Sequence, residues 1–132
     1  VRSRRQRQMC IRDRANPTKV AAVVGVIPVT NMNSAIADAF SSQINAAYGG
    51  SYTDAAFGAD HNPYVFASSL SGIPGQLWVG DTDTIAKLSD ANVVASAAPS
   101  IQVMTLSGAH AESTLGLIDL DVMQAFIDAH KT

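Results

Sequence analysis

An acid and an imidazole each follow a short apolar segment of this chain. Residues 76–79 lead into a turn that ends at Asp83, and residues 101–106 lead into a turn that ends at His110. Short apolar runs bounded by turn residues are typical of buried strands. In open parallel α/β sheets, ligands and reacting groups collect beyond the carboxyl ends of the strands. We therefore expect Asp83 and His110 to meet there, the carboxylate orienting the imidazole and the imidazole acting as a general base.

The sequence does not show which group such a base would activate. A serine nucleophile is often presented by the strand-to-helix turn G-x-S-x-G, and this motif does not occur in the chain. Each residue also has a structural interpretation, Asp83 as the N-cap of a helix that starts at Thr84 and His110 as a solvated loop histidine. Their placement after consecutive strands favours the catalytic interpretation. Asp81 is expected to stabilise its turn or to cap a helix.

The segments before this pair predict a strand followed by helices. Residues 19–29 form a continuous β-branched run, which predicts a parallel strand that is buried on both faces and central in its sheet. Apolar residues at every fourth position predict a helix over residues 33–48, closed by Gly49. Residues 51–61 are turn-rich and predict a loop. Asn62-Pro63 then predicts a short helix that ends at Leu70.

The second half of the chain continues the alternation. We predict strands at residues 77–79 and 101–106, and helices at residues 84–97 and 117–130. In the last helix, four apolar residues are available for packing: Leu117, Leu120, Phe126 and Ile127. A helix lies in every connection and no hairpin signal separates the strands. The chain is therefore predicted to be an α/β protein with a three-stranded parallel sheet and flanking helices.

The composition indicates a single acidic domain that follows a basic N-terminal segment. The chain has 132 residues, of which 47% are hydrophobic and 15% charged, and this suits a single domain with a core. Six of the nine Lys and Arg residues lie in the first 14 positions, so the remainder is acidic and is expected to repel nucleic acid. No apolar stretch is long enough to span a membrane, so no membrane partner is expected. Cys10 is the only cysteine, which excludes an internal disulfide.

Other chemistry-bearing residues form weaker patterns. Asp60 with His61, and His110 with Glu112, lack the spacing of a metal site, so we expect no metal. Aromatic residues gather between positions 48 and 66, where they would either line a substrate pocket or pack a small subdomain onto the sheet. These residues are Tyr48, Tyr52, Phe57, Tyr64 and Phe66.

Residues 1–14 differ in composition from the rest of the chain. They are Arg-rich and show neither a helical nor a strand period. One interpretation is a basic arm for an anionic partner, and another is a disordered tail. The run Met9-Cys10-Ile11-Arg12-Asp13-Arg14 resembles a translated sequencing adapter of the kind found at the ends of open reading frames from assembled environmental DNA. That resemblance implies that residues 1–14 are artefactual and that the gene is truncated.

The later motifs resemble the C-terminal half of an α/β-hydrolase. Gly72-Ile73-Pro74 precedes a strand, and Gly80-Asp81-Thr82-Asp83 after it looks like the family's G-x-x-D turn. The turn Ser107-Gly108-Ala109-His110 looks like the family's histidine loop. The resemblance implies that Asp83 and His110 are the acid and the histidine of a Ser-Asp-His triad. They are 27 positions apart and occur in the family's chain order.

The resemblance implies a serine hydrolase acting on small carboxylic esters without a cofactor. Residues 15–132 would be part of the domain and residues 31–62 its cap region. The nucleophile, the oxyanion hole and the first strands would lie upstream, so this chain alone is expected to be inactive and to self-associate through its truncated sheet. Alternatives are a peptidase or haloperoxidase-like activity on the same scaffold, and a non-catalytic flavodoxin-like or Rossmann-like module. In such a module Asp83 and His110 would be spatially unrelated.

Overall fold

Three parallel strands form the sheet of this protein. The computed structural model describes residues 20–35 and 40–131. Within these ranges the strands are adjacent in the order β1-β2-β3, with bounds Val23–Val26, Gly75–Gly80 and Ile101–Leu106. The predicted α/β class and three-stranded parallel sheet are confirmed. The predictions for residues 1–14, including the adapter resemblance, lie outside the described residues.

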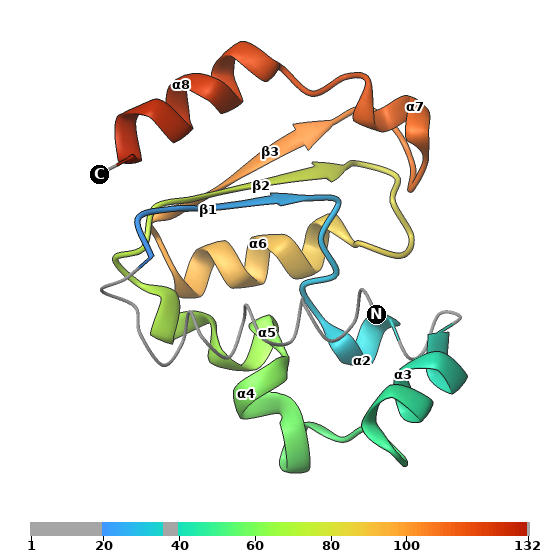
Figure 1. The fold of residues 1–132 in the computed structure, drawn as a ribbon. Coiled ribbons are helices and arrows are strands. Elements are labelled where there is room, and N and C mark those ends of the chain that lie inside the picture. The colour runs from blue at the N-terminus through green and yellow to red at the C-terminus, as the bar shows by residue number, and fades with distance from the viewer. Residues whose placement is uncertain (1–19, 36–39, 132) are drawn as a thin grey trace.

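Helices occupy every connection between the strands. Figure 1 shows α6 (Leu88–Ala97) on one face of the sheet and α8 (Leu120–His130) on the other. Of the helices between β1 and β2, the last two contact α6, and Figure 1 shows the whole group on the same side of the sheet as α6. The group consists of α2 (Met32–Ala35), α3 (Ser41–Tyr48), a π-helical turn (Asp54–Gly58), α4 (Ala59–His61), α5 (Pro63–Phe66) and a 3-10 turn (Ala67–Leu70). The short helix α7 (Glu112–Leu115) lies between β3 and α8.

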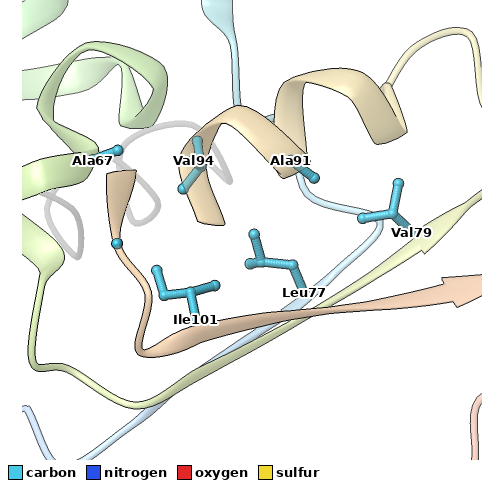
Figure 2. Packing of buried hydrophobic residues seen from close by; sticks show 7 residues of the cluster. Ala67, Leu77, Val79, Ala91, Val94 and Ile101 are labelled. Carbon is cyan, nitrogen blue, oxygen red and sulfur yellow. The ribbon is translucent and has the colours of Figure 1, made fainter. Parts of the chain in front are cut away.

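The core lies between β2, β3 and α6. Ala91, Val94 and Ala98 recur at helical spacing and are almost fully buried against the sheet. The other members of the cluster, all of which Figure 2 labels, are Ala67, Leu77, Val79 and Ile101. Burying a side chain of the size of Val or Leu contributes about 1.5–3 kcal/mol, so this packing fixes β2 and β3 as neighbours. Their register places Gly80 level with Leu106, and the loops that follow therefore begin side by side.

Strand β1 is shorter and more exposed than expected. The predicted strand over residues 19–29 narrows to Val23–Val26, and in the described part of the sheet it is an edge strand instead of the central one. Val26 is 43% exposed, so burial on both faces is also wrong. The pairing stops because Ile27, which donates its N–H to the Trp78 carbonyl at 2.8 Å, has a positive φ of 44°. Pro28 follows and has no N–H with which to continue a ladder.

Residues 54–61 are helical, so the prediction of a loop over residues 51–61 is wrong for all but the first three. Thr53 caps the π-helical turn, its hydroxyl accepting the Ala56 N–H at 3.3 Å. Asn62 is fully buried and donates its side-chain amide to Asp54 at 3.0 Å, which ties the end of this segment to its start. The helix that begins at Pro63 and reaches Leu70 through a 3-10 turn agrees with the prediction.

The last helix differs from the prediction in its start and its packing. It begins at Leu120 instead of Leu117, because Asp119 caps it by accepting the N–H groups of Asp121 and Val122 at 3.1 and 3.0 Å. Three of the residues expected to pack are exposed: Leu117 (54%), Leu120 (70%) and Ile127 (42%). The remaining one, Phe126, packs on His130 with the rings tilted by 42° and their centroids 4.5 Å apart. The described residues therefore leave an apolar surface uncovered on α8.

Candidate active site

Two loops at the carboxyl edge of the sheet form the candidate site. We call residues 80–86 the acid loop, because it carries Asp83, and residues 107–111 the histidine loop, because it carries His110. The acid loop follows β2 and the histidine loop follows β3. Since β2 and β3 are parallel neighbours, both loops emerge at the same edge of the sheet. The fold thus brings together the two residues singled out from the sequence.

Asp83 and His110 are in direct contact. The Nδ1 atom of His110 lies 2.9 Å from Oδ2 of Asp83, within hydrogen-bond range. The Asp83 side chain is fully buried and the His110 side chain is 40% exposed. An imidazole held at Nδ1 by a carboxylate carries its proton there and keeps Nε2 as the basic nitrogen. The carboxylate is thus shielded from water, whereas the imidazole remains accessible to a reacting group.

The second oxygen of Asp83 organises the acid loop. Oδ1 accepts the N–H groups of Ile85 and Ala86, each at 2.8 Å. Three N–H donors therefore satisfy this buried carboxylate, as a buried charge requires. The expected cap of a helix starting at Thr84 is wrong, because this turn holds residues 84–86 outside the helix and α6 begins only at Leu88. Asp83 combines the turn-forming role with the contact to His110.

Backbone contacts join the two loops. The Asp81 N–H donates to the Leu106 carbonyl at 2.8 Å, and the Thr82 N–H donates to the Gly108 carbonyl at 3.1 Å. In the opposite direction the Gly108 N–H donates to Oδ1 of Asp81 at 2.8 Å. Asp81 was expected to stabilise its own turn or cap a helix, and its carboxylate instead bonds to the other loop. These contacts extend the pairing of β2 and β3 beyond the strands.

Two glycines allow this close approach. A Cβ on Gly80 would collide with the Gly108 carbonyl oxygen, so only a residue without a side chain fits there. Gly108 has a φ of 149°, and a Cβ on it would collide with the Thr114 hydroxyl. Both glycines belong to the motifs noted in the sequence, but their steric role is visible only in the structure.

Thr114 is a site residue that sequence reasoning missed. It is 2% exposed, and its hydroxyl donates to the Ala109 carbonyl at 2.7 Å. The same carbonyl accepts the Ala111 N–H at 2.8 Å, which closes a γ-turn with His110 at its centre. Thr114 lies in α7, which was not predicted, and no local pattern marks it. Its role depends on the path of the histidine loop.

Three of the five aromatic residues between positions 48 and 66, namely Tyr48, Tyr52 and Phe57, pack on one another. The Tyr48 ring lies 5.0 Å from Tyr52 and 4.8 Å from Phe57, and its hydroxyl is 3.0 Å from Nδ1 of His61. Burial, and then the hydrogen bond to Asp54, raises the pKa of Tyr52. These contacts lie within the segment, so packing onto the sheet and a role as pocket lining both stay predictions.

The described residues show neither a metal site nor a membrane-spanning helix. No group of three or more His, Cys, Asp or Glu side chains in residues 20–35 and 40–131 is arranged to hold a metal ion. Over the same ranges, no helix is both long and apolar enough to cross a membrane. Comparisons with protein-family profiles, with curated proteins and with solved structures found no match. The case for a function therefore depends on the geometry of the two loops.

Proposed function

We propose that this chain is the C-terminal portion of a serine hydrolase of the α/β-hydrolase type, acting on carboxylic esters, with Asp83 as the acid and His110 as the base. The observation that supports it is the 2.9 Å contact between a fully buried carboxylate and a partly exposed imidazole. A non-catalytic module of the flavodoxin-like or Rossmann-like type provides no reason for these side chains to meet. The order of elements also supports the proposal, because Asp83 follows β2 and His110 follows the parallel strand β3.

The proposed chemistry follows from the state of the ring. A serine hydroxyl is a weak nucleophile near neutral pH, so a base must remove its proton during attack on the ester carbonyl. With Nδ1–H bonded to Asp83, His110 presents Nε2 for that proton and then returns it to the leaving alcohol. Asp83 stabilises the imidazolium that forms between these steps and holds the ring in the required tautomer.

The proposal requires a nucleophile and oxyanion donors from outside the described residues. Without a hydroxyl within reach of Nε2 the base has nothing to deprotonate, and without oriented N–H donors the tetrahedral intermediate has no stabilised oxygen. The 132-residue chain alone is expected to show no esterase turnover above background and no labelling by a fluorophosphonate. Both activities should appear when the coding sequence upstream of residue 15, recovered from the source DNA, is restored.

Matched variants of the restored protein test the proposed roles. His110→Asn should abolish fluorophosphonate labelling, whereas His130→Asn, at the end of α8, should leave it unchanged. Asp83→Asn should reduce turnover by about 10⁴-fold, the usual loss when a triad acid becomes an amide. Labelling of the 132-residue chain itself, abolished by replacing one of its own serines, would contradict the proposal. An upstream sequence that lacks a G-x-S-x-G turn would also contradict it.

A further inference from the structure

Two side-chain contacts of the same sequence separation join the acid loop to the histidine loop. Asp83 contacts His110 at 2.9 Å, and Asp81 accepts the Gly108 N–H at 2.8 Å, each across 27 positions. The two acids are two residues apart, and so are their partners. One contact therefore holds the ring of His110, and the other holds the backbone two residues before it.

The backbone before His110 is fixed from several sides. The Gly108 N–H is bound by Asp81 and the Gly108 carbonyl by the Thr82 N–H. The next carbonyl, that of Ala109, accepts both Ala111 N–H and the Thr114 hydroxyl. The Ala109 carbonyl belongs to the peptide group that ends at the His110 nitrogen, so its orientation sets the direction of the His110 side chain. Asp81 is the only carboxylate among these partners.

We propose that Asp81 is a positioning residue for His110. By accepting the Gly108 N–H, its carboxylate holds the histidine loop in the path that places the imidazole against Asp83. This inference rests on the proposed function, because it assigns Asp81 to the same acid and base pair. Asp81 itself is exposed, and its carboxylate accepts the Gly108 N–H and not the His110 ring N–H, which Asp83 accepts.

A structural contact elsewhere in the fold provides a matched control. The Ser100 hydroxyl accepts the Gly72 N–H at 3.1 Å, across 28 positions, at the amino ends of β2 and β3. It is also a bond from a backbone N–H to a side-chain oxygen that joins the segments flanking these strands. Ser100→Ala therefore removes a comparable bond at the far end of the same strands, away from His110, together with the 3.4 Å bond that the same hydroxyl donates to the Leu70 carbonyl.

The test uses the 132-residue chain with two measurements. Hydrogen exchange of the peptic fragment that contains Gly108 reports on the histidine loop. The ¹⁵N spectrum of labelled histidine, recorded where the ring is neutral, gives the fraction of His110 with its proton on Nδ1. Asp81→Ala should speed exchange at Gly108 about tenfold, the equivalent of one lost hydrogen bond, and lower the Nδ1–H fraction. Asp81→Asn keeps an acceptor oxygen and should stay close to the native values, as should Ser100→Ala.

The outcomes separate this inference from the proposed function. An unchanged Nδ1–H fraction in Asp81→Ala would overturn the positioning role, and so would an equal change in Ser100→Ala. A lowered Nδ1–H fraction of His110 in Asp81→Asn would contradict the inference, because the positioning role of Asp81 needs only an oxygen that accepts the Gly108 N–H. Asp83→Asn is the reference, since it acts on the ring directly. If Asp83→Asn also leaves His110 unchanged, the acid and base pair itself is wrong and both proposals fall.

Discussion

Replacing the Asp83 carboxylate by an amide should reverse the tautomer of His110. In the native site two oxygens serve three N–H donors: Oδ1 accepts from Ile85 and Ala86, each at 2.8 Å, and Oδ2 lies 2.9 Å from His110 Nδ1. Asn has nearly the same shape but only one oxygen and an NH₂ group that donates. Asp83→Asn therefore cannot satisfy the acid loop and the native ring at the same time.

The number of hydrogen bonds preserved decides whether the amide oxygen of the Asp83→Asn variant faces the acid loop or His110. Placing the amide oxygen toward Ile85 and Ala86 preserves two hydrogen bonds, and placing it toward His110 preserves one. A net hydrogen bond is worth about 1 kcal/mol, and turning the NH₂ toward two backbone donors in a buried position costs about 1–3 kcal/mol more. The combined preference of about 2 kcal/mol or more corresponds to a ratio of about 30. The NH₂ group then faces Nδ1, which must accept, and the ring proton moves to Nε2.

Histidine ring NMR measures this directly. The chain has three histidines, so spectra of ¹⁵N-labelled histidine are simple, and His110→Asn assigns the signal. We expect the neutral ring to carry its proton on Nδ1 in the native chain and on Nε2 in more than nine-tenths of the Asp83→Asn molecules, according to the preference above. Asp121→Asn, in the exposed first turn of α8, should leave the signal unchanged. A ring that keeps its proton on Nδ1 in Asp83→Asn would refute the assignment of Asp83 as the group that orients His110.

Three further outcomes follow from the geometry. Gly80→Ala should lower the free energy of unfolding by about 1–3 kcal/mol because its Cβ collides with the Gly108 carbonyl, whereas Gly50→Ala meets no atom within 4 Å; equal denaturant midpoints would contradict this. Burial raises the pKa of Tyr52 in the folded state, so its contribution to stability is present below the ordinary tyrosine pKa and is lost as the pH rises above it. Unfolding measured from pH 9 to 11 should show that loss in the native chain and not in Tyr52→Phe. Leu120, which is 70% exposed, should promote self-association, so Leu120→Glu should shift sedimentation toward the monomer; unchanged sedimentation of an associated chain would argue for another surface.

Strands β2 and β3 and the contact between Asp83 and His110 were predictable because their signals are local. Residues 101–106 are an apolar run between turn residues, and the structure has β3 at Ile101–Leu106. Once β2 and β3 are parallel neighbours, any residue just beyond each strand arrives at the same edge of the sheet. The contact between Asp83 and His110 therefore follows from the parallel pairing of β2 and β3 and from the position of each residue just beyond its strand.

The predicted and observed helices differ where side chains form hydrogen bonds that the local sequence pattern does not reveal. The helix predicted from Thr84 begins only at Leu88, because Asp83 binds the N–H groups of Ile85 and Ala86 in a turn. Residues 51–61 look like a loop because their polar residues are typical of turns. Three of those polar groups instead bond within the segment or to Asn62, which is fully buried. Partners that are distant in the chain leave no local signal.

Because Gly80 lies level with Leu106, the number of residues between each strand and its site residue is constrained. The acid and histidine loops start level, and Asp83 is three residues beyond Gly80 while His110 is four beyond Leu106. Inserting or deleting one residue in either stretch would move the carboxylate or the ring by about 3.3 Å, more than a hydrogen bond can absorb. Homologous chains should therefore keep the two spacings that follow the strands.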